Sequence, residues 1–327
     1  MVDASISTLT FLLPTGDIYD EEEIHQYCHL GCRIGGRGCI GHHPWRAGCP
    51  VCHQDARRLK KNIPMASRNS AEFKSRYGPW AVVTGASSGI GAEFSRQLAA
   101  LGLNLVLVAR RQERLARSKL ELEAQHNIQV LTVACDLQHT EAVAELAAAT
   151  AGLDLGLLVN CAGFAVTGEF TQHRIEDEVS LLHVDCRALM MLSHHFGKKF
   201  VARRRGGIIN VASAASFMPL PYWAHYSAAK AYVLQLSEGL WFEMKKHGVD
   251  VLALCPGSTQ TEFAQVAGTS MEGMDVKPVV SQAIEGLGRK IRVTPGLGNR
   301  VAAIIPRLIP RRLSILLGSQ VVRPARS

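Results

Sequence analysis

The stretch Thr84-Gly85-Ala86-Ser87-Ser88-Gly89-Ile90-Gly91 follows a short apolar run, Trp80–Thr84, and leads into a helix-length amphipathic segment. Glycines suit this place because the chain must turn sharply and a pyrophosphate must come close to the backbone. The N–H groups and the dipole of the following helix favour the phosphate charge. The alternative is an ordinary glycine-rich turn between a strand and a helix. We expect a dinucleotide to be bound by Gly85, Ser87, Ser88, Gly89, Ile90 and Gly91.

Apolar runs of about five residues alternate with helix-length segments from Trp80 onward, which is typical of repeated βαβ units. The expected strands cover residues 80–84, 105–109, 128–133, 155–160, 207–211, 250–254 and 290–294. The expected helices cover residues 91–101, 112–124, 141–149, 174–203 and 226–246. We therefore predict an α/β fold, a Rossmann-type doubly wound parallel sheet of about seven strands.

The two flanks differ in composition from the middle of the chain. The 327 residues carry a net charge of +8, and 47% of them are apolar, too many for general disorder. Residues 1–77 carry +2, residues 78–288 carry −3, and residues 289–327 carry +9 without any acidic residue. We expect three parts: a Cys/His-rich extension over 1–77, a nucleotide-binding domain over 78–295 and a basic, apolar tail over 296–327.

The extension holds five of the nine cysteines, namely Cys28, Cys32, Cys39, Cys49 and Cys52. The odd total predicts free thiols in a reducing compartment. The spacing of two Cys pairs resembles zinc knuckles, with Cys39, His29, His42 and His53 as further ligands. The interpretation that we favour is simpler. Met65 precedes the first strand by a short lead, so residues 1–64 are expected to be an upstream segment that is disordered or absent from the working protein, without a metal.

The tail mixes arginines with apolar residues, and Pro306 and Pro310 interrupt it. One interpretation is an interfacial helix attracted to anionic lipid. The other is a segment that folds over a substrate pocket or is buried against a partner subunit. The chain has no uninterrupted apolar stretch of 18 residues, and no basic residues precede its first apolar stretch. We therefore expect neither a spanning helix nor a secretory signal. Since no recognised module accompanies the charge, we also expect no nucleic-acid binding.

Two arginines, Arg110 and Arg111, follow the second expected strand, and no acid precedes Glu113. An acid at this place suits a free ribose 2′-hydroxyl, whereas an arginine suits a 2′-phosphate. The alternative is a solvated helix start. Asp136 ends the third strand, where its carboxylate would accept a bond from the adenine amino group or cap a helix. We expect a preference for NADP(H), with NAD(H) as the alternative cofactor.

Tyr226 and Lys230 lie four residues apart at the start of an expected helix, so both side chains share one face. A phenol has a pKa near 10, too high for acid/base chemistry unless its anion is stabilised. A nearby ammonium group lowers this pKa. Ser213 ends the fifth strand, where its hydroxyl would polarise a substrate oxygen.

These motifs together resemble the short-chain dehydrogenase/reductases over residues 77–263. The resemblance implies alcohol and carbonyl interconversion, with Ser213, Tyr226 and Lys230 as the catalytic set and Asp185 where the family has an asparagine. It also implies that Tyr226 and Lys230 contact the cofactor, as do Asn160, Ala162, Gly163, Pro256, Gly257 and Thr261. Cys161 replaces a second family asparagine, and we expect only a subtle loss of hydrogen bonding.

We expect an NADP(H)-dependent oxidoreductase acting on a lipophilic ketone, aldehyde or alcohol, because the expected pocket loops are mostly apolar. The resemblance implies a homodimer or homotetramer. We expect a cytoplasmic protein, with peripheral membrane contact through the tail. The rival hypothesis is a catalytically weak, nucleotide-sensing interaction protein that uses a zinc-binding extension.

Overall fold

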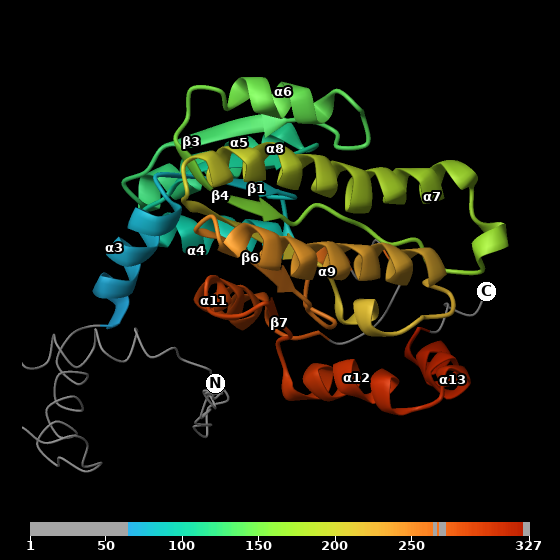
Figure 1. Ribbon diagram of the computed structural model, residues 1–327. Coiled ribbons are helices and arrows are strands. Elements are labelled where there is room, and N and C mark those ends of the chain that lie inside the picture. The colour runs from blue at the N-terminus through green and yellow to red at the C-terminus, as the bar shows by residue number, and fades with distance from the viewer. Residues whose placement is uncertain (1–64, 264–266, 268–272, 323–327) are drawn as a thin grey trace, which may run out of the picture. The chain divides into compact units, whose positions relative to one another are not determined.

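In the computed structural model, which describes residues 65–263, 267 and 273–322, seven parallel strands form one sheet (Figure 1). Their order is β3-β2-β1-β4-β5-β6-β7. The strands are β1 (Trp80–Thr84), β2 (Asn104–Ala109), β3 (Val130–Ala134), β4 (Leu155–Asn160), β5 (Gly206–Val211), β6 (Val249–Leu254) and β7 (Arg292–Val293). The predicted doubly wound sheet is therefore confirmed.

Helices cover both faces of the sheet. One face packs against α4 (Gly89–Ala100), α5 (Gln112–Gln125) and α11 (Val276–Gly286). The other packs against α6 (Ala142–Ala149), α8 (Leu189–Ala202) and α9 (Ala224–Lys245). Neighbouring residues of a strand point to opposite faces, so Val82 and Val83 enter different cores. Burial on both faces explains why these strands are continuous apolar runs.

Helix α3 (Met65–Tyr77) was not expected, because residues 1–77 show no sustained helical period. Its end is held by tertiary contacts. Tyr77 is buried and Phe73 packs against the same core. The Tyr77 hydroxyl donates to Asp250 Oδ2 over 2.6 Å, and Arg76 pairs with the same carboxylate at 2.7 Å. Such long-range contacts leave no pattern in the local sequence.

The single helix expected over 174–203 is interrupted. Helix α7 (Ile175–Leu182) continues into a π-helical turn, η2 (His183–Ala188), before α8 begins. Such turns insert one extra residue per turn and often occur at functional sites. Here the turn carries Asp185, whose side chain is fully buried.

The tail forms two helices, α12 (Leu297–Leu308) and α13 (Arg311–Val321). Pro310 lies between them, and Pro306 falls inside α12. In Figure 1 both helices lie beside the carboxyl-terminal half of the sheet domain. Among the helices of the described residues, none is long and apolar enough to cross a membrane.

Candidate active site

A cavity of about 490 Å³ opens at the carboxyl ends of the strands, where β1 and β4 separate the two halves of the sheet. Ligands of open α/β sheets bind at this point, because the loops from the two halves diverge here. The lining includes most of the expected site: Gly85, Ser87, Ser88, Gly89, Ile90, Gly91, Arg110, Arg111, Asp136, Ala162, Gly163, Ser213, Tyr226, Lys230, Pro256, Gly257 and Thr261. Asn160 and Asp185 lie behind this wall and do not line the cavity.

The glycine-rich turn forms one end of the cavity. Gly85 and Gly89 have φ values of 68° and 55°, which favour glycine over other residues. A Cβ atom on Gly91 would lie 2.3 Å from the Gly85 carbonyl oxygen, so only glycine fits there. Helix α4 begins at Gly89, and no side chain caps it at Ser88. Its first N–H groups therefore remain for an anion such as a pyrophosphate.

Both arginines after β2 line the cavity beside this turn. Arg111 Nη2 donates to Ser87 Oγ and Ser88 Oγ at 2.9 and 2.8 Å. Arg110 is more exposed and lies 3.8 Å from Asp136 Oδ2. Asp136 also accepts the N–H of Gln138, so it stabilises its own turn. Two guanidinium groups next to a phosphate-binding turn fit a cofactor with an additional phosphate.

A contact that the sequence did not reveal crosses this end of the cavity. Glu262, in the segment after β6, accepts from Arg111 at 2.8 Å and from Arg114 at 2.5 Å. These two bonds hold the pKa of Glu262 at about 2. Arg111 and Glu262 are 151 positions apart in the chain, so no local sequence motif predicts their contact.

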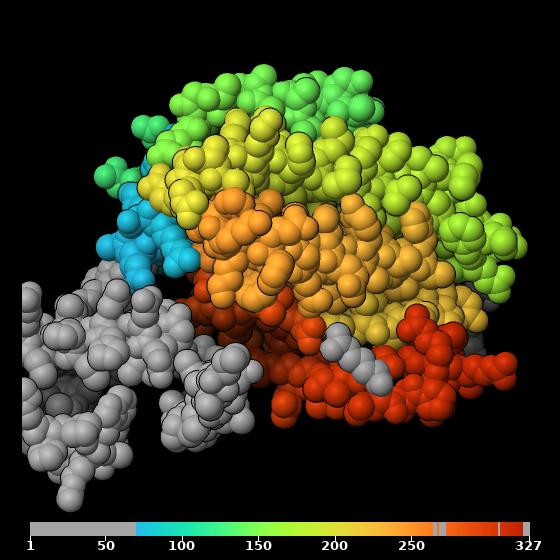
Figure 2. Space-filling model, in the orientation of Figure 1, coloured from blue at the N-terminus to red at the C-terminus, as the bar shows by residue number. Residues whose placement is uncertain are grey.

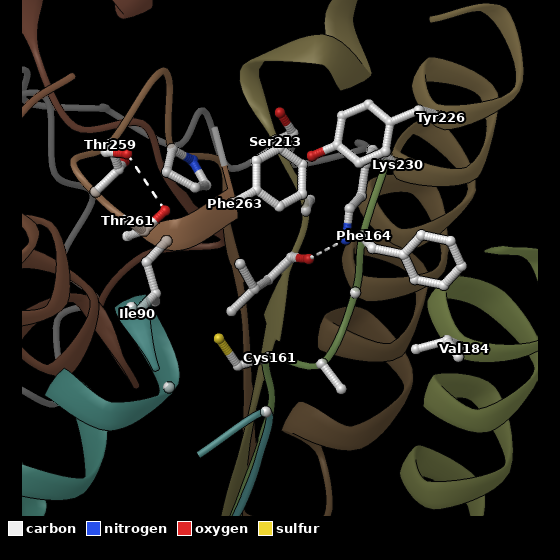
Figure 3. A pocket seen from close by; sticks show the side chains of 18 of the residues that line it. Ile90, Cys161, Phe164, Val184, Ser213, Tyr226, Lys230, Thr259, Thr261 and Phe263 are labelled. Atoms are coloured by element: carbon white, nitrogen blue, oxygen red, sulfur yellow. Dashed lines mark hydrogen bonds between the residues drawn. The ribbon is translucent and has the colours of Figure 1, made fainter. Parts of the chain in front are cut away.

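The chemical end of the cavity is formed by the start of α9 and the end of β5. Figure 3 shows the side chains of Ser213, Tyr226 and Lys230 near one another, with the Lys230 ammonium directed to a backbone carbonyl. Lys230 Nζ lies 5.7 Å from the Tyr226 ring centroid and donates to the Val211 carbonyl at 3.1 Å. Ser213 Oγ accepts the N–H of Ala215 at 3.1 Å, which leaves its hydroxyl hydrogen for another acceptor. The three residues expected to act together are thus brought together.

Asp185 forms a buried ion pair with this set. Its Oδ2 lies 2.9 Å from Lys230 Nζ, and its Oδ1 accepts the Phe164 N–H at 3.1 Å. Burial alone lowers the pKa of Lys230, but the charges of Asp185 and Tyr226 outweigh it and raise the pKa of the lysine overall. A Cβ on Gly163 would approach both Asp185 carboxylate oxygens to 2.9 Å, so glycine makes room for the pair.

The same carboxylate affects the phenol. Burial and the Asp185 charge raise the pKa of Tyr226, whereas Lys230 and the hydrogen bond with Ser213 lower it. The net result is a raised pKa, so the phenol is protonated at neutral pH. Asp185 therefore offsets part of what Lys230 does to Tyr226.

The turn after β4 is anchored by the first strand. Thr84 Oγ1 accepts the N–H groups of Cys161 and Ala162 at 2.9 and 3.1 Å. The Cys161 side chain lines the cavity, and burial raises the pKa of its thiol to about 12. Asn160 lies deeper. Its amide donates to Ser193 and Asn210 at 3.1 and 2.9 Å, so it joins strands and helix rather than facing the cavity.

The turn after β6 closes the opposite wall. The Ala214 N–H donates to the Pro256 carbonyl at 2.8 Å, which joins this turn to Ser213. Thr261 packs against Gly89, where an added Cβ would lie 3.0 Å from the threonine side chain. The tail helix α12 contributes Asn299, whose amide lies 2.4 Å from a Cβ placed on Gly257. Neither Asn299 nor its place in the cavity wall was expected from the sequence.

The remaining wall is apolar and aromatic. It includes Phe164, Met218, Leu220, Trp223, Phe263, Ala302 and Val321. The rings of Trp223 and Phe263 lie 5.2 and 5.7 Å from the Tyr226 ring, between centroids. Such a wall excludes water and suits an apolar ligand beside the phenol.

No cluster of His, Cys, Asp or Glu among the described residues has the arrangement to hold a metal ion. The cysteines and histidines of the zinc-knuckle alternative fall within residues 1–64, outside the described part of the chain.

Comparisons with known proteins agree with this site. The family model described as short chain dehydrogenase matches residues 79–272. The 7beta-hydroxysteroid dehydrogenase of Mediterraneibacter gnavus is 30% identical over 238 residues, 70% of this chain and 90% of that protein.

Two solved structures are similar as well. A short-chain dehydrogenase from Sphingobium yanoikuyae in complex with NADPH has a TM-score of 0.66 and 32% identity, covering 76% of this chain and 98% of that one. The bulky-bulky ketone specific alcohol dehydrogenase from Comamonas testosteroni has a TM-score of 0.64 and 30% identity, covering 77% and 97%.

Fold, cavity and relatives together define a nucleotide-binding oxidoreductase. The chain belongs to the short-chain dehydrogenase/reductase family. Its reaction is the interconversion of an alcohol and a carbonyl compound by hydride transfer.

Proposed function

We propose that the protein reduces a lipophilic ketone with NADPH. The observation that carries this proposal is the placement of Tyr226 beside Lys230 and an apolar wall, in a cavity whose other end is lined by Arg110 and Arg111. A nicotinamide cofactor supplies the hydride when it is bound. The protein must then supply a proton to the carbonyl oxygen, exclude water and orient the substrate.

Tyr226 is the proton donor in this proposal. Its raised pKa keeps the phenol protonated at neutral pH, which is the state that reduction consumes. The Ser213 hydroxyl donates to the same substrate oxygen and stabilises the negative charge that develops there. Lys230 stabilises the resulting phenolate, because its ammonium group lies on the same face of α9.

The cofactor is proposed to be held along the strand ends. The open N–H groups of α4 suit the pyrophosphate, and Gly85, Gly89 and Gly91 allow its approach. Arg110 and Arg111 suit a 2′-phosphate, and no carboxylate stands directly after β2 to accept a free ribose hydroxyl. The similar structure of the Sphingobium protein contains NADPH, which supports the same preference here.

The substrate class follows from the wall beside Tyr226. Aromatic and aliphatic side chains from three loops and from the tail surround the space in front of the phenol. A hydrophobic ketone gains free energy by leaving water for such a wall. Relatives named for hydroxysteroids and for bulky ketones support a substrate of this kind.

The test is NADPH consumption against a panel of ketones that increase in size and hydrophobicity. We expect turnover with the native chain, and a loss of about 100- to 10,000-fold in kcat with Tyr226→Phe. Tyr222→Phe is the matched control, because Tyr222 also contributes to the packing near the cavity but does not line it.

The rival hypothesis, a nucleotide-sensing protein, makes the opposite prediction. The native chain would bind NADPH tightly, reduce none of the ketones and show no difference from Tyr226→Phe. That result would contradict the reductase proposal.

We also propose a homo-oligomer that assembles through α7, α8 and α9. Exposed apolar side chains gather on these helices, among them Val179, Leu182, Met190 and Tyr232. The face also carries exposed acids such as Glu176 and Asp177, so it suits a protein partner better than an anionic surface. Light scattering of the native chain and of Leu182→Asp measures the oligomeric state.

A further inference from the structure

Helix α12 presents one continuous apolar face to solvent. Leu297, Val301, Ile304 and Leu308 recur at intervals of three or four residues, so they lie on one side of the helix. Leu297 and Leu308 are each 77% exposed. The opposite side holds the buried Ala303 and the cavity residues Asn299 and Ala302. The helix is therefore fixed on the protein by one side, and its larger apolar residues face outward.

Helix α13 is arranged in the same way. Ser314 and Gly318 are buried, and a Cβ on Gly318 would lie 2.5 Å from the Pro219 carbonyl oxygen. Leu313, Leu316 and Leu317 lie on the other side and are exposed. Of the nineteen large apolar side chains that are exposed in the described part of the chain, ten lie in α12 and α13. Figure 2 shows the two helices next to each other on this face of the molecule.

The charge of this surface has one sign. Arg300, Arg311 and Arg312 are exposed, and residues 289–327 contain no Asp or Glu. Among the described residues, none of these three arginines forms an ion pair with an acid. A cationic surface with protruding leucines is complementary to a surface that is anionic outside and apolar beneath.

We propose that α12 and α13 form a docking surface for an anionic phospholipid bilayer. At a rise of about 1.5 Å per residue, helices of this length are far too short to span a hydrocarbon core of about 30 Å. They would lie in the interface, with leucines in the acyl boundary and arginines at the headgroups. The apolar face of α7, α8 and α9 lacks this chemistry, because acidic residues accompany it.

The docking surface is also part of the cavity wall. Ala302 of α12 and Val321 of α13 line the cavity, and Val321 is exposed as well. A bilayer on this surface would bring acyl chains and dissolved lipophilic molecules next to the substrate space. The delivery of lipophilic molecules to the substrate space rests on the proposed function, whereas the docking on the bilayer does not.

The test is flotation of the full chain with vesicles, without cofactor or substrate. Vesicles of phosphatidylcholine alone are compared with vesicles in which a third of the lipid is phosphatidylserine. We expect binding to the anionic vesicles only, and its loss at high salt, because screening weakens the attraction to the headgroups. Since turnover is not measured, failure here leaves the reductase proposal untouched.

Two double variants test the surface, one for its arginines and one for its leucines. Arg311→Gln with Arg312→Gln should weaken binding roughly 30-fold, because each basic residue near an anionic surface contributes about one kcal/mol. Leu308→Asp with Leu316→Asp should abolish it. Leu120→Asp with Phe242→Asp is the matched control, since those side chains are 69% and 76% exposed elsewhere and their replacement should change nothing.

Three outcomes would overturn the proposal. One is equal binding to both kinds of vesicle, and another is no binding to either. The third is that the leucine variants leave flotation unchanged but lower the molar mass in light scattering, which would show that a second copy of the chain covers α12 and α13. The melting temperature of each variant is compared with that of the native chain, and an unchanged value confirms that the fold is retained.

Discussion

At the scale of single residues, Asp185 is the feature that most changes the chemistry of the site. An asparagine in its place would be neutral, whereas the carboxylate pairs with Lys230 at 2.9 Å in a fully buried position. The pair neutralises much of the ammonium charge that would otherwise stabilise the Tyr226 phenolate. The Asp185 charge therefore raises the pKa of Tyr226, against the lowering effect of Lys230.

Asp185→Asn should shift the pH dependence of catalysis. The carboxylate raises the pKa of Tyr226, so its removal lowers that pKa. Reduction needs the protonated phenol and should decline at a lower pH than in the native enzyme. Oxidation needs the phenolate, so its rise should also move to lower pH. The measurement is kcat/KM against pH in both directions.

The control for this change is Asp177→Asn, which removes an exposed carboxylate from the preceding helix. Its pH profile should match the native one. If Asp185→Asn had the native profile as well, Asp185 would have no influence on the proton donor. Asp185→Asn should also lower the melting temperature, because Lys230 would be left buried without its anionic partner.

At the scale of elements, the sheet and its loops were predictable to different degrees. All seven expected strands agree with the structure within two residues at each end, because buried parallel strands are short apolar runs between polar turns. The seventh, β7, is shorter than expected, at Arg292–Val293. The glycine turn and the Tyr226–Lys230 pair were also visible, since each lies within eight consecutive residues.

Contacts between distant elements were not predictable. The helix expected over 174–203 gives no local signal for its π-helical turn, and α3 depends on Tyr77 meeting Asp250. Glu262 and Asn299 reach the cavity from segments far along the chain. A periodic pattern reports which face of an element is buried, but it does not report what is packed against that face.

The bridge between α5 and the segment after β6 should control cofactor selection. Glu262 binds Arg111 and Arg114 next to the proposed 2′-phosphate position. Glu262→Gln removes a negative charge that repels this phosphate and frees two guanidinium groups. NADPH should bind about threefold to tenfold more tightly, as expected for the loss of about one kcal/mol of competing interaction. NADH affinity should not change, and fluorescence titration measures both.

Glu113→Gln is the control, because this exposed acid lies in the first turn of α5, whereas the arginines of the bridge pair with Glu262. A similar gain with NADH would contradict the assignment of this end of the cavity to a 2′-phosphate. A loss of NADPH affinity would show instead that Glu262 holds Arg111 in its binding position.

At the scale of the whole molecule, the tail completes the cavity of the enzyme. The family model ends at residue 272, whereas Asn299, Ala302 and Val321 line the cavity. The expectation that the tail folds over the pocket and the expectation that it meets lipid are compatible, because the two sides of α12 and α13 face different surroundings. Deeply buried tail residues, such as Ser314 and Val322, attach these helices to the domain.

Gly318→Val should separate tail attachment from cofactor binding. Its new side chain would collide with the Pro219 carbonyl and approach Leu220, a residue of the cavity wall, so α13 must move outward. Overpacking of this kind costs about 1–3 kcal/mol, and the melting temperature should fall. KM for a bulky ketone should rise, while the Kd for NADPH stays the same, because the glycine turn and the arginines lie at the other end of the cavity. Gly298→Val in α12 is the matched control, since nothing lies within 4 Å of its added Cβ, and it should alter neither constant. An unchanged KM in Gly318→Val would mean that α13 does not shape the substrate space.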